Sequence, residues 1–246
     1  MFSCFAITNI VKLKKLFLYI IKKEIDTYSV FFMPGMAANS KIFEFIKLPK
    51  NFKLHYLEWL QPKEDEDLNS YVHRLSKNIN GKNIVLIGVS FGGIIVQELS
   101  KIMIVKKVII ISSVKSRHEL PLMMQLSKKT KAYKFLPLNW IDDFESLVVF
   151  VFGPMVKKRI SLYRKYLSFR DENYLKWAIH QIVNWEQNKP DKNTIHIHGT
   201  HDLVFPSIYI KNAIFVKGGN HAMILRKASW FTKNLPKLIT HCNKGL

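Results

Sequence analysis

Cysteine is almost absent from this chain of 246 residues, which contains only two. Cys4 and Cys242 stand at opposite ends of the sequence, so they offer neither a disulfide framework nor the close spacing of a zinc site. So few cysteines favour a reducing compartment, and we therefore expect a cytoplasmic protein.

Acidic residues and arginine are also scarce. Only 18 residues are Asp or Glu, against 38 that are Lys or Arg, which gives a formal net charge of +20. This charge would suit a nucleic-acid partner, but just six of the basic residues are Arg, the side chain that best binds phosphate and guanine in bidentate fashion. No helix-turn-helix, zinc-finger or RNA-binding motif accompanies the charge. We therefore expect no nucleic-acid partner.

Long hydrophobic runs are missing from the N-terminal extension, residues 1–26, although this segment is both basic and apolar. Within residues 9–23 the longest uncharged run, LFLYII, is far shorter than the ~20 residues of a membrane-spanning helix. Lysines follow its first apolar stretch and no small-residue cleavage site appears, so it does not resemble a secretory signal. Wound as an α-helix, residues 9–23 separate an apolar face from a lysine-rich face.

This basic amphipathic helix has two interpretations. Its apolar face can cover the edge of a β-sheet, as the faces of globular helices commonly do, or it can lie on an anionic membrane. The apolar residues are Ile10, Leu13, Leu16, Phe17, Ile20 and Ile21, and the lysines are Lys12, Lys15, Lys22 and Lys23. We favour the first interpretation and keep peripheral contact with a membrane surface as the alternative.

Glycine is scarce too, with ten in the chain, yet three of them fall within IVLIGVSFGG, residues 84–93. Residues 84–87 are typical of a strand buried on both faces, and residues 92–102 have helical spacing. A serine at the centre of G-x-S-x-G, between a strand and a helix, is the setting of a nucleophile elbow. A plain turn would use the same residue types, but this context favours a catalytic role for Ser90.

The helix after Ser90 has a clear pattern. Its spacing places Ile95, Leu99 and Ile102 on the inner face and Gln97, Glu98 and Lys101 on the outer face. A further glycine, Gly93, allows close packing between this helix and the strand before it.

Short apolar runs alternate with helical patterns along the rest of the chain. The other strand candidates are residues 28–33, 53–59, 107–112, 194–198 and 213–216, and residues 67–79 have helical spacing. This alternation predicts right-handed crossovers and a mostly parallel sheet with helices on both faces, which is the α/β class.

The interval between the fourth and fifth strand candidates is about 80 residues long, far more than a simple crossover needs. It contains four helix-like pieces, residues 120–131, 140–152, 155–168 and 172–185. We therefore expect an α/β core made of residues 27–114 and 190–246. Residues 115–189 would form a helical cap over the carboxyl edge of the sheet.

A serine nucleophile needs a base to accept its proton and an acid to orient that base. Asp202 follows the fifth strand candidate and His221 follows the sixth, so both should lie at the same edge of the sheet as Ser90. The chain order Ser, Asp, His is also the order that α/β-hydrolases use.

The chain from about residue 28 to residue 238 resembles the α/β-hydrolases in three blocks, GVSFGG, HGTHDLVFP and GGNH. The resemblance implies that Ser90 is the nucleophile, Asp202 the orienting acid and His221 the general base. A fourth block, PGMA, stands where the family often has His-Gly after its first parallel strand, so the backbone N–H groups of Met36 and Phe91 would be the oxyanion donors.

The sequence departs from the family pattern at three places. Pro34 replaces the family's usual His, although a backbone donor does not depend on the side chain beside it. Only 27 residues precede the first strand candidate, so we expect the family's leading antiparallel hairpin to be reduced or missing. The interval between Asp202 and His221 also leaves little room for a full helix.

Histidines near the fifth strand candidate raise the question of a metal. His196, His198 and His201 lie close together in sequence, but no H-E-x-x-H spacing appears and no nearby carboxylate completes a water-activating ligand set. We interpret His196 and His198 as histidines of the sheet, and expect neither a metal nor a cofactor.

Together these patterns predict a serine hydrolase that acts on a small or medium acyl compound, with a carboxylic ester as the favoured substrate. Two alternatives remain open. One is an acyltransferase or thioesterase on the same fold, and the other is a catalytically silent module that binds a ligand.

Overall fold

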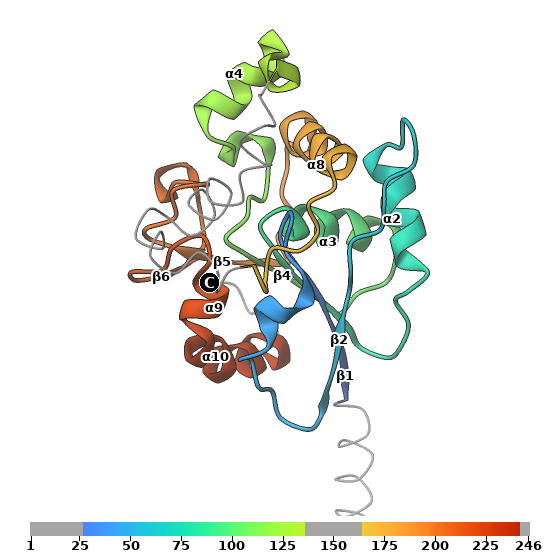
Figure 1. Cartoon of the computed structure of the whole chain (residues 1–246). Helices are drawn as coiled ribbons and strands as arrows, with labels where there is room; N and C mark the ends of the chain where they lie inside the picture. Colours follow the sequence, from blue (N-terminus) through green and yellow to red (C-terminus); the bar gives the residue numbers. More distant parts are fainter. Residues whose placement is uncertain (1–26, 136–163, 242–246) are drawn as a thin grey trace, which may run out of the picture.

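A six-stranded sheet forms the centre of the computed structural model, which describes residues 27–135 and 164–241 (Figure 1). Its order is β2-β1-β3-β4-β5-β6, and every neighbouring pair is parallel. The strands are β1 (Tyr28–Met33), β2 (Phe52–Tyr56), β3 (Ile84–Val89), β4 (Lys107–Ile111), β5 (Thr194–Gly199) and β6 (Ile214–Val216). The predicted α/β sheet is therefore confirmed, and no antiparallel strand occurs among the described residues.

The central strands are almost entirely apolar because helices cover both faces of the sheet. Every residue of β1 and of β4 is buried, so neither strand alternates between polar and apolar side chains. The helices are α2 (Leu68–Ser76), α3 (Phe91–Ile102), α4 (Leu122–Thr130), α8 (Glu172–Asn184), α9 (Met223–Arg226) and α10 (Ala228–Thr240). Single turns of 3₁₀-helix are η1 (Ser40–Phe43), η2 (Arg117–Glu119), η3 (Ala132–Phe135) and η5 (Ser207–Tyr209).

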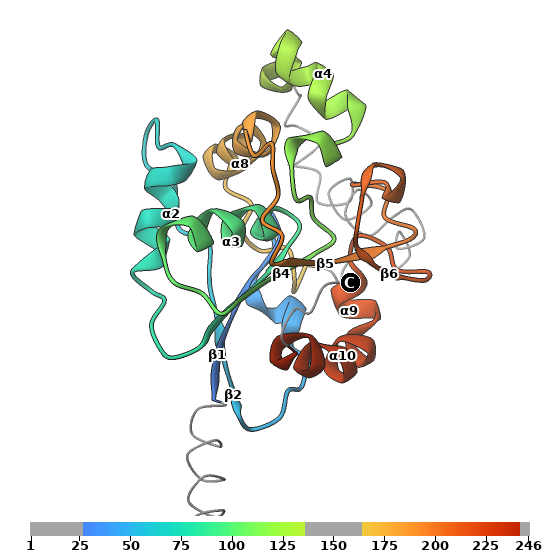
Figure 2. The ribbon, with the colours of Figure 1, turned by 180° about the vertical axis from the view of Figure 1, so that it is seen from behind.

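The path of the chain decides which helix covers which face. The chain moves outward from β1 to β2 and then crosses back over β1 to reach β3. Because parallel crossovers are right-handed, this reversal places η1 and α2 on opposite faces. Figures 1 and 2 show α2 and α3 on one face, and α10 with η1 and α9 on the other. The reversal also makes the carboxyl ends of β1 and β3 the topological switch point, where ligands bind in such sheets.

Two strand ends differ from the sequence prediction by more than one residue, each for a local reason. β2 ends at Tyr56, not at residue 59, because its partner β1 ends at Met33 and Pro34 has no N–H to donate. β3 continues through Gly88 to Val89 because these residues still pair with Ile110 and Ile111 of β4.

The prediction that Gln97 faces outward is wrong. Gln97 is buried, and its Nε2 donates to the carbonyl oxygens of Gly93 at 2.8 Å and Val114 at 3.0 Å. Its Oε1 accepts a hydrogen bond from Nε2 of Gln187 at 2.9 Å. Helical spacing could not reveal this burial, because the covering chain comes from the distant interval after β4.

That interval, between β4 and β5, contributes α4 and α8, which lie above the carboxyl edge of the sheet (Figure 1). The indole N–H groups of Trp177 and Trp185 attach α8 and its end to the body of the protein, through the Glu66 carbonyl at 2.6 Å and the Glu98 carboxylate at 2.7 Å. The predicted helix over residues 140–152 falls outside the described residues, as do the N-terminal helix and residues 155–163 of the helix predicted over 155–168. The described remainder of that prediction, residues 164–168, is a turn followed by irregular chain and not a helix. In the described ranges, no helix has the length and hydrophobicity needed to cross a bilayer.

Candidate active site

Ser90 lies at the turn between β3 and α3, with φ 52° and ψ −123°. Residues other than Gly rarely adopt this backbone conformation. Its N–H donates to the Ile111 carbonyl at 2.9 Å, and its carbonyl accepts from the N–H of Gly93 at 2.8 Å. The Ser113 hydroxyl donates to the same carbonyl at 2.7 Å. Three hydrogen bonds thus hold this strained turn and direct the serine away from the strand.

Two glycines make the turn possible because backbone passes very close to them. A Cβ on Gly88 would lie 2.1 Å from the carbonyl oxygen of Gly92. A Cβ on Gly92 would lie 2.3 Å from the carbonyl oxygen of Pro34. No other residue type fits at either position without a shift of backbone.

Ser90, His221 and Asp202 form one chain of hydrogen bonds. The Nε2 of His221 lies 2.9 Å from Oγ of Ser90, and its Nδ1 lies 2.9 Å and 3.1 Å from the two carboxylate oxygens of Asp202. The three residues follow β3, β6 and β5, so parallel pairing brings them to one edge of the sheet. The structure therefore brings together all three side chains that the sequence singled out.

The Asp202 carboxylate is buried, and protein groups supply its hydrogen bonds. Its Oδ1 accepts the backbone N–H groups of Val204 and Phe205, both at 2.9 Å. Burial opposes ionisation, but the His221 ring and these hydrogen bonds outweigh it and hold the pKa of Asp202 below its ordinary value. Asp202 is therefore an anion at neutral pH, and it favours a proton on Nδ1 of His221.

Two further histidines, His196 and His198, lie on β5 near Asp202. His198 is fully buried, its Nε2 is 2.8 Å from the Phe205 carbonyl oxygen, and it lies 3.7 Å from the Asp202 carboxylate. Burial lowers the pKa of His198 and lowers that of His196 further, so both rings are neutral. In the described part of the chain no three His, Cys, Asp or Glu side chains are grouped so as to hold a metal.

The loop after β1 runs past Ser90. The N–H of Ala38 donates to the Gly35 carbonyl at 3.0 Å and closes a turn in which Ala37 has a positive φ of 64°. A Cβ on Gly35 would lie only 3.3 Å from Cβ of Ser90. Met36 follows Gly35 and lines the same cavity as Ser90, and within the described ranges the N–H groups of Met36 and Phe91 have no acceptor.

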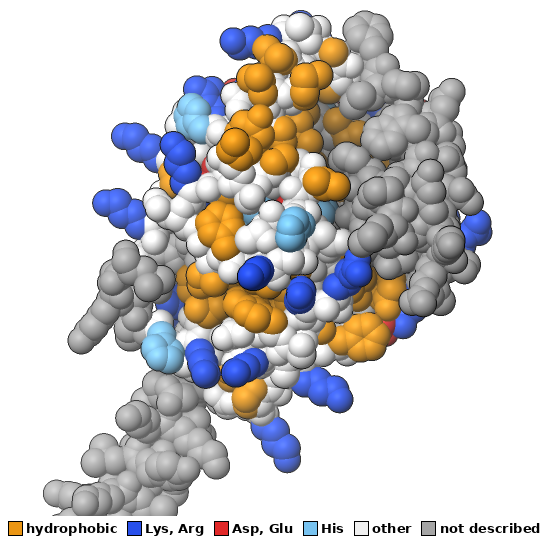
Figure 3. All heavy atoms as spheres, turned by 90° about the vertical axis from the view of Figure 1, so that its left-hand side faces the viewer, with side chains coloured by type: hydrophobic (Ala, Val, Ile, Leu, Met, Phe, Trp, Pro, Cys, Tyr) orange, Lys and Arg blue, Asp and Glu red, His pale blue; other side chains and the backbone are white. Residues whose placement is uncertain are grey.

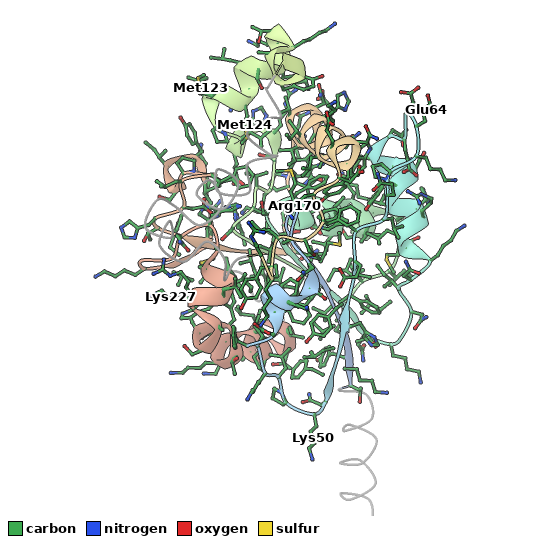
Figure 4. The ribbon with its side chains drawn as sticks, in the orientation of Figure 1. Lys50, Glu64, Met123, Met124, Arg170 and Lys227 are labelled. Atoms are coloured by element: carbon green, nitrogen blue, oxygen red, sulfur yellow. The ribbon has the colours of Figure 1, made fainter. Side chains whose placement is uncertain are left out.

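A cavity of about 380 Å³ opens beside Ser90 and His221. Its described lining is almost entirely apolar and includes Met123, Met124, Ile179, Ile182, Val204 and Phe205. The polar lining side chains are Ser90, Ser127, Tyr133 and His221, and no Lys, Arg, Asp or Glu of the described residues is among them. Figure 4 shows Met123 and Met124 projecting from α4 above the sheet edge.

Among the described residues, none of the basic side chains that contribute to the net charge of +20 lines this cavity. In Figure 3, Lys and Arg side chains are spread over the surface shown, with hydrophobic side chains gathered between them. The cavity therefore suits an uncharged, apolar ligand despite the basic surface around it.

Two residues that support the site were not predicted from the sequence. Ser113 holds the elbow from the loop after β4, and Trp59 donates its indole N–H to the Gly35 carbonyl at 3.0 Å. Neither belongs to a motif, because each acts on backbone that is distant in sequence. The one signal that the sequence offered was an aromatic residue, Trp59, at the end of the strand predicted over residues 53–59.

Solved structures of similar fold come from several organisms. A hydrolase from Pseudomonas aeruginosa PA01 matches with a TM-score of 0.65 and 13% identity, over 88% of this chain and 91% of that one. A bromoperoxidase from Bacillus anthracis matches with a TM-score of 0.64 and 18% identity, over 87% and 92%. A lipase-esterase related protein from Clostridium acetobutylicum ATCC 824 matches with a TM-score of 0.59 and 15% identity, over 87% and 96%.

Sequence comparison gives no such match: no family model and no curated protein sequence matches the chain. The likeness is thus one of three-dimensional structure, and it extends over nearly the whole of each neighbour. The chain has the α/β-hydrolase fold.

Proposed function

We propose that the protein is a serine hydrolase that cleaves an uncharged acyl compound, most simply a carboxylic ester, through an acyl-enzyme on Ser90. The observation that carries this proposal is the unbroken chain of hydrogen bonds from Asp202 through His221 to Ser90, at the wall of an apolar cavity. A nucleophile, a base and an orienting acid at these distances are the groups that acyl transfer needs.

The first half of the reaction follows from these positions. Oγ of Ser90 attacks the substrate carbonyl while its proton passes to Nε2 of His221. Asp202 stabilises the resulting imidazolium through Nδ1–H. The imidazolium then gives the proton to the leaving alcohol as the bond between carbonyl carbon and alcohol oxygen breaks, which leaves the acyl group on Ser90.

Water completes the cycle by the same route. His221 takes a proton from water, the hydroxyl attacks the acyl carbon, and the proton returns to Oγ of Ser90 as the free acid departs. In both halves the carbonyl oxygen becomes an oxyanion. The N–H groups of Met36 and Phe91 are the proposed donors, and their lack of acceptors in the described structure leaves them free for this task.

The cavity supports the choice of substrate class. A volume of about 380 Å³ with an apolar lining favours an acyl chain of small to medium size over a sugar, a phosphate or a charged acid. The names of several structural neighbours, among them a thermophilic esterase from Thermogutta terrifontis, fit the same class.

Two measurements test the proposal. A fluorophosphonate probe should label the wild-type protein and should not label Ser90→Ala, while both proteins unfold at nearly the same temperature. A panel of p-nitrophenyl esters from acetate to palmitate should give turnover that peaks at one acyl length and disappears in Ser90→Ala.

Each other outcome has a distinct meaning. Labelling that persists in Ser90→Ala would remove Ser90 as nucleophile. Absence of both labelling and turnover in the wild-type protein would favour a silent ligand-binding module. Acyl-enzyme that forms rapidly but is released only by an added alcohol or thiol would favour an acyltransferase.

A further inference from the structure

Trp59 lies three residues beyond the end of β2, between the two loops that carry the proposed oxyanion donors. It is 5% exposed, and its ring lies parallel to that of Phe91, with centroids 5.2 Å apart and 9° between the planes. Tyr174 of α8 contacts it at 5.2 Å between centroids. The indole is thus fixed in place by aromatic rings from α3 and α8.

The indole N–H acts on the first donor. It donates to the Gly35 carbonyl oxygen at 3.0 Å. That carbonyl and the N–H of Met36 belong to one peptide group, which is trans and planar, so the two point in opposite directions. A donor that holds the carbonyl therefore also fixes the direction of the Met36 N–H.

The indole ring acts on the second donor. Phe91 is the residue whose backbone N–H begins α3, and its side chain is stacked on Trp59. One side chain thus contacts the carbonyl of the peptide group that carries the Met36 N–H and the side chain of Phe91, whose own N–H is the second proposed donor. Because stabilisation of an oxyanion requires its donors to be held within a few tenths of an ångström, a fixed spacer between the two loops has direct consequences for rate.

From this geometry we infer that Trp59 is a positioning residue that sets the direction of the Met36 N–H relative to that of Phe91. The inference rests on the proposed serine hydrolase activity. A purely structural tryptophan would fill space and satisfy its N–H, and its loss would affect stability without a specific effect on the tetrahedral intermediate.

The test is Trp59→Phe, which keeps an aromatic ring against Phe91 but removes the N–H donor. We expect kcat for the preferred ester to fall at least tenfold with KM changed less than twofold. Affinity for an alkyl boronic acid, which forms a tetrahedral adduct on a serine, should fall by a similar factor. Replacement of Trp59 by 3-benzothienylalanine, which preserves the shape of the indole, should have the same effect if Trp59→Phe folds poorly.

Trp185→Phe is the matched control, since Trp185 is equally buried and donates its indole N–H to Glu98 at 2.7 Å, away from the site. It should keep its kcat and boronate affinity even if its unfolding temperature falls. Wild-type kcat and boronate affinity in both Trp59 variants would overturn the inference. So would equal losses in the Trp59 and Trp185 variants.

The two proposals fail in different ways. If the wild-type protein hydrolyses no ester and takes no fluorophosphonate, the hydrolase proposal itself is wrong. If the wild-type protein is active and dependent on Ser90 but insensitive to loss of the Trp59 N–H, only the role of Trp59 is wrong.

Discussion

The Nε2 of His221 lies 2.9 Å from Oγ of Ser90, although 131 residues separate the two along the chain. Two strands, β4 and β5, separate β3 from β6 in the sheet, so this contact depends on the register of every pair between them. The loop after β6 must reach back across the carboxyl edge. The N–H of His201 helps by donating to the Gly219 carbonyl at 2.8 Å, which joins the acid's loop to that of the base.

The first prediction concerns Asp202→Asn. The N–H groups of Val204 and Phe205 both point at one carboxylate oxygen, so the amide oxygen of Asn will take that place and its NH₂ will face His221. Nδ1 of His221 must then accept, which leaves Nε2 protonated and unable to take the proton of Ser90. We expect kcat for ester hydrolysis to fall by about 10³- to 10⁴-fold with little change in unfolding temperature.

Asp191→Asn serves as its control, because Asp191 is an exposed carboxylate in the turn before β5. It should hydrolyse esters at the wild-type rate. A loss of less than about tenfold in Asp202→Asn would mean that another group orients the base.

The second prediction concerns acyl length. Ile182 lies in α8, is almost fully buried and lines the cavity. Ile182→Phe adds volume to a closely packed wall, so the cavity should become shorter. We expect kcat/KM for the longest accepted ester to fall roughly tenfold while that for acetate changes little. The measurement is the same ester panel, applied to both proteins.

Ile104→Phe, at a position that is 96% exposed, makes the same substitution away from the cavity. Its ester profile should match that of the wild-type protein. An unchanged profile in Ile182→Phe would show that the acyl chain lies elsewhere.

The third prediction concerns stability in mild acid. Burial lowers the pKa of His196 and of His198 below the ordinary value of 6.5, so in the folded state both rings take up a proton only at a lower pH than in the unfolded chain. The unfolded chain takes up protons on both rings as the pH falls through about 6.5, and therefore binds more protons. Their contribution to stability is fully present above that pH and is lost below it, at up to about 1.4 kcal/mol per pH unit for each ring. The free energy of unfolding should therefore fall between pH 7 and pH 5.

Urea unfolding at several pH values measures this slope, and His196→Leu should flatten it. His73→Gln, at an exposed position, should leave the slope unchanged. Burial raises the pKa of Glu119, which therefore acts in the opposite direction as pH falls, and Glu119→Gln separates its contribution. A slope that His196→Leu does not alter would contradict the prediction.

The fourth prediction concerns the elbow glycine Gly92. A Cβ added to Gly92 would lie 2.3 Å from the Pro34 carbonyl oxygen and 2.5 Å from the Met33 carbonyl oxygen. These are backbone atoms, which cannot move aside as the end of a side chain can. We expect Gly92→Ala to lower the free energy of unfolding, measured in urea, by about 1–3 kcal/mol and to abolish fluorophosphonate labelling. Ser100→Ala on the same helix should cost much less, because the Ser100 hydroxyl only caps a nearby carbonyl. Equal stability of the two variants would contradict the close contact at Gly92.

Much of the fold could be predicted because local patterns record burial. The apolar runs over β1, β3 and β4 mark strands covered on both faces, and the glycines around Ser90 mark a turn that only glycine allows. Parallel strands end at one edge, so residues that follow β3, β5 and β6 had to lie near one another. The proximity of Ser90, Asp202 and His221 was predictable for that reason, while their catalytic roles stay predictions.

What could not be predicted depends on contacts between segments that are distant in sequence. Gln97 follows the outward pattern of α3, yet it is buried because Gln187 and Val114 cover it. Trp59 is a strand-end aromatic whose partner, the Gly35 carbonyl, lies in another loop. No periodicity within a single element carries this information, since the pairing is decided by tertiary structure.

The strained backbone of Ser90 also has a consequence for the order in which the protein assembles. Its hydrogen bonds come from Gly93, Ile111 and Ser113, and its close neighbour Gly35 lies after β1, so all of these contacts fall in the first half of the chain. On the ribosome, β1 to β4 emerge before Asp202 and His221 have been synthesised. The nascent chain can thus set the serine in place first, and the later residues bring an acid and a base to a nucleophile that is already presented.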